Sequence, residues 1–143
     1  MPAKWLFKSE PGTYSFSDLI RDGKTTWDGV SNNLALKNLR SVHRGDLVLI
    51  YHTGIERSVV GIAEAASEPY PDPKQKDPKL VVVDIAPREK LARPVPLDKI
   101  RAGGKRDGSP LAQFDLLRLP RLSVMPVSEA QWKAIIALSD LKQ

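Results

Sequence analysis

The sequence contains no cysteine, and only two of its 143 residues are histidine. The lack of cysteine excludes disulfides, thiolate metal sites and cysteine nucleophiles, and two histidines alone make a poor zinc site. We therefore expect neither a metal nor a cofactor. Long apolar runs are also missing, since no stretch approaches the roughly 20 apolar residues that span a bilayer. Glu10 and Pro11 follow too closely behind Phe7 for a signal-peptide core. We expect a soluble cytoplasmic protein, or a nuclear one in a eukaryote, without a membrane partner.

The composition is that of a folded protein with an uneven distribution of charge. Apolar residues make up 41% and charged residues 27% of the chain, which predicts one globular domain over residues 1–143. Residues 1–71 carry 8 basic and 8 acidic side chains, whereas residues 72–143 carry 14 and 9, so the net charge of +5 lies entirely in the second half. Such a basic face suits a polyanionic partner. Many small basic proteins bind no polyanion, so charge alone leaves this question open.

Short apolar runs alternate with segments of helical periodicity, which predicts an α+β domain around a mixed or barrel-like sheet. We expect strands at residues 4–7, 46–52, 58–66, 80–86, 116–119 and 121–125. The second and third, joined by a loop with Gly54, form a hairpin, and their lack of strict alternation predicts burial on both faces. We expect a helix over residues 15–23, capped by Ser15 or Ser17, with Phe16, Leu19 and Ile20 on one face. Further helices are expected over 31–43, with Ser31 or Asn32 as the cap, over 96–102, and after Ser128, which caps the last one. The turn dipeptide Asp28-Gly29 predicts that Trp27 lies on a loop. Residues 68–79, with four prolines, predict an exposed connection, and residues 102–109 a mobile basic loop.

Motifs of common enzyme classes are missing. Gly103-Gly104-Lys105 lacks the earlier glycine of a phosphate-binding loop, where this chain has Lys99, and Arg106 stands where that loop needs serine or threonine. His52, at the end of an expected strand, is a candidate general base, although a lone histidine in such a place is more often structural. No nucleophile, base and oxyanion donor can be assembled from the sequence.

Aromatic residues beside short polar groups favour a binding function. Recognition of an exposed nucleobase needs flat side chains for stacking and hydrogen-bonding groups for the edge of the base. Trp5, Tyr14, Trp27 and Tyr51 each stand next to such groups at the expected ends of elements. The alternative is that these aromatic side chains simply fill the core of a small domain.

Several motifs, taken in order, resemble the EVE domain family over nearly the whole chain. They are Trp5 to Pro11 (WLFKSEP), Tyr14 to Leu19, Thr26 to Val30 (TWDGV), Gly45-Asp46, Tyr51-His52, Val60-Gly61, Ala66 to Pro73 and Pro120 to Val124, followed by a helix with Trp132. The resemblance implies a PUA-like fold, in which short peripheral helices surround a barrel-like sheet. It also implies a non-enzymatic module that recognises a modified base of DNA or RNA in a pocket holding a flipped or unpaired nucleotide.

The same resemblance implies which residues form the site. The base-binding pocket would consist of Trp5, Ser9, Glu10, Tyr14, Ser15, Trp27, Gly29, Val30, Asn32, Tyr51 and His52. We expect Trp27 to supply stacking, Asn32 and Ser9 to read the edge of the base, and Lys8 with Lys105 and Arg106 to hold phosphate. The family commonly has Val-Arg-Asn-Tyr where this chain has Val30-Ser31-Asn32-Asn33. Two alternatives stay open: an enzyme acting on a nucleotide or nucleic acid with His52 as base, and a partner-binding scaffold whose pocket is closed.

Overall fold

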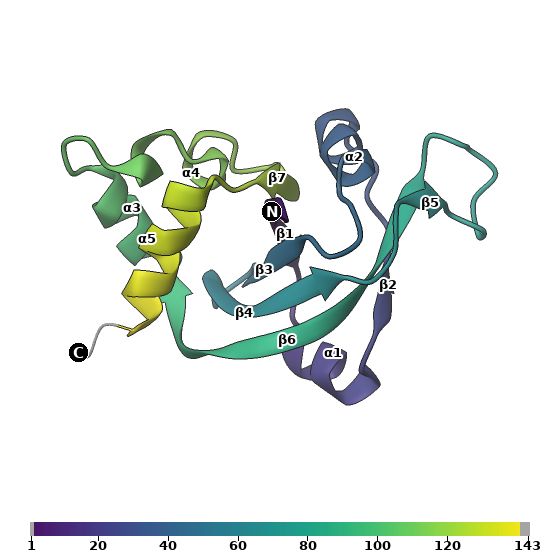
Figure 1. The fold of residues 1–143 in the computed structure, drawn as a ribbon, viewed down its shortest axis with the longest axis horizontal. Coiled ribbons are helices and arrows are strands. Elements are labelled where there is room, and N and C mark those ends of the chain that lie inside the picture. The colour runs from purple at the N-terminus through teal and green to yellow at the C-terminus, as the bar shows by residue number, and fades with distance from the viewer. Residues whose placement is uncertain (1, 141–143) are drawn as a thin grey trace.

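A curled mixed sheet forms the centre of the fold, and short helices lie around it (Figure 1). The computed structural model describes residues 2–140. The strands are β1 (Lys4–Ser9), β2 (Thr25–Trp27), β3 (Leu47–His52), β4 (Ser58–Ala65), β5 (Tyr70–Pro71), β6 (Val81–Pro96) and β7 (Val124–Pro126). The helices are α1 (Phe16–Asp22), α2 (Asn33–Arg40), α3 (Leu97–Gly104), α4 (Asp115–Arg118) and α5 (Glu129–Asp140), with a 3-10 helix at Pro110–Gln113.

The strand order in the sheet is β2-β6-β4-β3-β1-β7, and β5 pairs with β6. β1 and β3 are parallel, with Lys8 opposite Tyr51 and Ser9 opposite His52, whereas the other pairs are antiparallel. This confirms the expected α+β class, the mixed sheet and the hairpin of β3 and β4. The register brings the end of β1 beside the end of β3, and both strands carry predicted site residues there.

Side-chain burial explains most of the helices and strands. Nearly all side chains of β3 and β4 are buried, as their continuous apolar sequence predicts. Phe16 and Leu19 anchor α1 in the core, but Ile20, expected on the same face, is exposed. Ser15 caps α1, and Ser128 Oγ accepts a hydrogen bond from Gln131 N (3.1 Å) at the start of α5. The Ser128 cap was predicted from the sequence, and Ser15 was one of the two residues predicted as candidates to cap α1.

Other expectations about secondary structure were wrong. Trp27 ends strand β2, where it pairs with Val83, and does not lie on a loop. Residues 116–119 are not a strand: Asp115–Arg118 form the helical turn α4, which buries Leu116 and places Asp115 and Arg118 2.9 Å apart in an ion pair. Residues 68–79 are mostly exposed, as expected, but Tyr70 and Pro71 within them form the short strand β5. The last expected strand is shorter, at Val124–Pro126.

The remaining differences concern the ends of elements. β6 continues ten residues beyond its expected end at Ala86, α2 ends at Arg40 rather than His43, and α3 continues to Gly104. Residues 103 and 104 therefore belong to a helix and not to a mobile loop. Within residues 2–140, no helix is both long enough and apolar enough to cross a membrane.

Candidate nucleic-acid interface

A tight turn at the end of β1 forms the first wall of the candidate site. The Glu10 carbonyl accepts hydrogen bonds from the backbone N–H groups of Thr13 and Tyr14, each at 2.9 Å. The Glu10 carboxylate accepts from Gly12 N at 3.1 Å, and the Ser9 hydroxyl donates to the Tyr14 carbonyl. These contacts fix the path of the chain from the sheet to α1.

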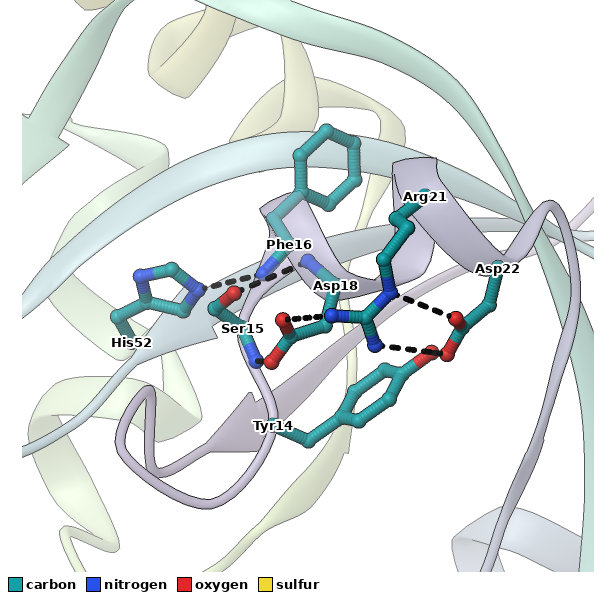
Figure 2. A network of polar contacts seen from close by, with 7 residues as sticks. All are labelled: Tyr14, Ser15, Phe16, Asp18, Arg21, Asp22 and His52. Carbon is teal, nitrogen blue, oxygen red and sulfur yellow. Dashed lines mark hydrogen bonds and ion pairs between the residues drawn. The ribbon is translucent and has the colours of Figure 1, made fainter.

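Helix α1 is held in place by its cap and by His52 (Figure 2). Ser15 and Asp18 form a capping box: Asp18 N donates to Ser15 Oγ at 3.0 Å, and Ser15 N donates to Asp18 Oδ2 at 2.9 Å. His52 Nε2 accepts from Phe16 N at 3.0 Å, and His52 Nδ1 lies 2.7 Å from Glu56 Oε1. Because Nε2 is an acceptor, the ring proton sits on Nδ1 and is donated to Glu56. Both ring nitrogens of this buried histidine therefore hold elements together.

Tyr14 is fixed by a network of charged groups on α1, also drawn in Figure 2. Its hydroxyl donates to Asp22 Oδ2 at 2.8 Å, and Arg21 binds Asp22 through Nε at 3.0 Å and Asp18 through a terminal nitrogen at 3.1 Å. Burial, with a contribution from Asp22, raises the pKa of Tyr14, while the hydrogen bond from Arg21 lowers the pKa of Asp22. Tyr14 thus stays a neutral phenol with a fixed ring.

Strand β2 and the residues after it form the opposite wall. The Trp27 ring packs against Phe7 with a centroid separation of 5.6 Å, and only 8% of Trp27 is exposed. The indole N–H of Trp27 donates no hydrogen bond within residues 2–140, and no fully buried side-chain nitrogen or oxygen in that range lacks a partner. The indole N–H is therefore a free donor that reaches solvent. Gly29 has φ of 75°, a left-handed conformation that turns the chain back toward Val30.

Lys8 also lines the site, and its ammonium group is held by a backbone carbonyl and an aromatic ring. Lys8 Nζ donates to the carbonyl of Pro120 at 2.7 Å and lies 5.8 Å from the centroid of the Tyr51 ring. Partial burial lowers the pKa of Lys8. One hydrogen bond leaves two further N–H donors of the ammonium available to an anion.

Together these segments enclose an open cavity of about 640 Å³. This volume lies within the usual range of ligand pockets. The cavity is lined by Lys8, Ser9, Glu10, Thr13, Tyr14, Thr25, Thr26, Trp27, Asp28, Gly29, Val30, Lys74 and Ser123. Its lining residues therefore include two with aromatic rings, several with hydroxyl groups, two with carboxylates and two lysines.

The structure brings seven of the expected site residues together at this cavity, namely Lys8, Ser9, Glu10, Tyr14, Trp27, Gly29 and Val30. Other expected residues have structural contacts instead. Trp5 Nε1 donates to Asp46 Oδ2 at 2.9 Å in the core, and Asn32 Oδ1 accepts from Ala35 N at 3.0 Å as the cap of α2. Ser15 caps α1.

The remaining expected residues lie near other surfaces. Tyr51 lines a neighbouring cleft and His52 joins α1 to β3. Lys105 follows α3, and Arg106 lines a separate hollow with Lys99. Figure 1 shows α3 and the loop after it at the opposite end of the sheet from β2.

Six lining residues were not predicted: Thr13, Thr25, Thr26, Asp28, Lys74 and Ser123. Thr26 and Asp28 belong to the motif around Trp27, so their proximity to the site could have been inferred from that motif. Lys74 and Ser123 come from distant segments and carry no local signal. Thr26 Oγ1 and Tyr70 OH also donate to Asp84 Oδ1, at 2.9 and 2.6 Å, and so join β2 and β5 to β6.

Comparison with known proteins identifies the family. The EVE domain model matches residues 3–138. The chain belongs to the EVE domain family. Mouse thymocyte nuclear protein 1 is 30% identical over 165 residues, which covers 95% of this chain and 73% of the mouse protein.

Solved structures agree with this assignment. Human THYN1 protein in complex with DNA containing 5-methylcytosine has a TM-score of 0.90 and 27% identity, with 99% of each chain covered. A Rhodopseudomonas palustris protein has a TM-score of 0.88 and 36% identity, covering 99% of this chain and 95% of that one. The ASCH protein of Zymomonas mobilis, at 13% identity and a TM-score of 0.57, shares the fold alone. The EVE-type, PUA-like fold expected from the motifs is confirmed.

Proposed function

We propose that this protein is a non-enzymatic nucleic-acid-binding module that holds one unpaired, modified base in the cavity between Tyr14 and Trp27. The observation that carries this proposal is the likeness, over 99% of the chain, to a protein solved with DNA containing 5-methylcytosine. The cavity has the size and chemistry for a base, with aromatic walls and hydrogen-bonding groups of both kinds.

The arrangement of polar groups suits the edge of cytosine. A carboxylate accepts from an exocyclic amino group, and a free N–H donates to a ring nitrogen or carbonyl. Asp28 and Glu10 supply carboxylates and Trp27 supplies the free indole N–H. Lys8 and Lys74 supply ammonium groups for the adjacent phosphates. In this proposal Trp27 forms a wall and donates a hydrogen bond, while Tyr14 supplies much of the apolar contact with the base.

The open cavity favours this interpretation over a scaffold with a closed pocket. Trp5 and Trp27 pack into the sheet, and neither fills the space. The enzyme alternative depended on His52, whose two ring nitrogens are already bonded to Phe16 and Glu56. We therefore assign His52 to the architecture of the site.

Binding to single-stranded oligonucleotides tests the proposal. We expect 5-methylcytosine to be preferred over cytosine by several-fold, since a methyl group in an apolar pocket contributes about 1 to 3 kcal/mol. Trp27→Ala should abolish this preference, as measured by fluorescence anisotropy. Trp5→Phe is the control, because Trp5 lies in the core away from the cavity. Equal affinity for modified and unmodified strands, unchanged by Trp27→Ala, would falsify the proposal.

A further inference from the structure

A single isoleucine projects into solvent at the tip of the β3–β4 hairpin. The relative exposure of Ile55 is 103%, whereas Ile20 and Leu34, the other exposed large apolar residues of the described range, are only 49% and 43% exposed. Ile55 thus gains nothing from contact with its own protein. Single, partly covered apolar side chains are ordinary on protein surfaces. A fully exposed one on a hairpin tip is available for insertion between the bases of a duplex.

The hairpin that carries Ile55 is firmly tied to the fold. On one side Thr53 N donates to Ser9 O at 2.9 Å, and on the other Leu97 N donates to Arg57 O at 2.8 Å. These bonds attach one end of the tip to β1 and the other to α3. Ile55 is therefore presented on a fixed support, and little conformational freedom remains to be lost when it binds.

The backbone of the tip holds an uncommon conformation. Arg57 has φ of 45° and is the one residue other than glycine with positive φ in residues 2–140. Arg57 Nε also donates to Gly54 O at 3.1 Å across the turn. Strained residues of this kind persist where the surroundings hold them and are concentrated at functional sites. Here the conformation forms the tight turn on which Ile55 is displayed.

The tip lies directly beside the base-binding cavity. A Cβ placed on Gly54 would be 3.7 Å from Glu10 Oε1, and Glu10 lines the cavity. On its other side the tip borders a cleft of about 390 Å³, to which Lys8, Arg57 and Arg101 contribute cationic side chains. Lys8 lines both the cavity and this cleft. A continuous surface therefore joins the cavity, the exposed isoleucine and three positive charges.

We propose that Ile55 is a wedge that enters the base stack of double-stranded DNA when a base leaves the stack for the cavity. Apolar wedges of this kind partly unstack a base step, and the larger surface that the protein then shares with the bent duplex offsets the loss of stacking. Lys8, Arg57 and Arg101 would hold the backbone phosphates beside the opened step. The inference rests on the proposed function and assigns to the same site a duplex target as well as a single strand.

Comparison of duplex and single-stranded binding tests this inference. We use a duplex with one central 5-methylcytosine, 2-aminopurine as its neighbour, and the matching single strand. Ile55→Ala should weaken duplex binding about tenfold or more. It should also reduce the rise in 2-aminopurine fluorescence that reports unstacking. Binding to the single strand should change by less than about twofold, because that base is already unstacked.

Two further variants, Ile55→Leu and Ile20→Ala, are the controls for Ile55→Ala. Ile55→Leu keeps an apolar wedge and should retain duplex binding, and Ile20→Ala removes the same atoms from an exposed site on α1 and should bind as the wild type does. Ile55→Ala removes no internal contact, so its melting temperature should stay that of the wild type.

Three results overturn the inference: unchanged duplex affinity of Ile55→Ala, equal losses on duplex and single strand, or a wild-type protein that binds only the single strand. In the first and third cases the single-strand preference for 5-methylcytosine still decides the proposed function independently.

Discussion

At the scale of single residues, Gly61 shows how a small side chain positions the site. A Cβ added to this β4 glycine would lie 2.4 Å from the Phe16 ring, far inside contact distance. Phe16 is the first residue of α1 and its N–H donates to His52. The absence of a side chain at residue 61 therefore allows α1 to sit close to the sheet, behind the wall that Tyr14 forms.

We expect Gly61→Ala to lower the free energy of unfolding by about 1 to 3 kcal/mol, because overpacking forces Phe16 and α1 to move. Urea denaturation measures this change. Gly103→Ala is the control: a Cβ there would meet only the end of the Leu111 side chain, at 3.1 Å, so the effect should be small. Equal stability of the two variants would contradict the close packing of Phe16 on β4.

Some features of the site could be predicted from the sequence, but the direction in which each tryptophan points could not. The motifs correctly collected the segments around Ser9, Tyr14 and Trp27 at one cavity. They could not decide whether each tryptophan faces the cavity or the core. That choice depends on strand register and on a distant partner, such as Asp46 for Trp5, and neither is written in the local sequence.

At the scale of elements, helix starts were predictable because caps are local. Ser15, Asn32 and Ser128 each bond to a backbone N–H three residues later, as their sequences suggest. The extent of β6 was not predictable from its sequence, because a proline such as Pro87 is typical of the end of a strand. The structure tolerates this proline beside a shift of register between β4 and β6, where Ala63 faces Pro87.

The cap of α1 provides a prediction at this scale. The sequence left Ser15 and Ser17 as alternatives, and the structure assigns the capping box to Ser15. Ser15→Ala should therefore lower the free energy of unfolding by about 1 kcal/mol. Ser17→Ala should change it by less than about 0.5 kcal/mol, since Ser17 is exposed. Thermal unfolding of both variants checks this, and a larger loss for Ser17→Ala would reverse the assignment.

At the scale of the whole molecule, charge is arranged differently in space than along the chain. The basic excess belongs to residues 72–143, yet the cations around the cavity and the adjoining cleft come from both halves. Lys8 and Arg57 belong to the first half, and Lys74 and Arg101 to the second. In the proposed function, selectivity and phosphate affinity would thus come from neighbouring surfaces and not from separate halves of the sequence.

This arrangement predicts how salt acts on binding. Contact of these four cations with phosphates gives a slope of about −3 to −4 for log affinity against log salt on a duplex. The ratio of affinities for modified and unmodified DNA should stay within about twofold, because base contacts are not screened in the same way. Fluorescence anisotropy at several salt concentrations measures both quantities.

Two variants locate the cations responsible. Lys74→Gln should reduce the steepness of that slope by about 1. The double variant Lys105→Gln with Arg106→Gln should leave the slope unchanged, since both residues directly follow α3, which lies at the opposite end of the sheet from β2. A shallower slope for the double variant would show that Lys105 or Arg106 does contact phosphates, contrary to this prediction.

The pairing of β1 has a consequence for how the chain folds. β1 pairs with β3 and β7, and Lys8 N donates to Ser123 O at 2.9 Å. The first strand can therefore complete its hydrogen bonds only when residues 123–126 have left the ribosome. Contacts of such long sequence separation form slowly. Until they form, β1 exposes an unpaired strand edge, which makes the nascent chain prone to aggregation. The cavity, which includes Ser123, would be among the last parts of the molecule to assemble.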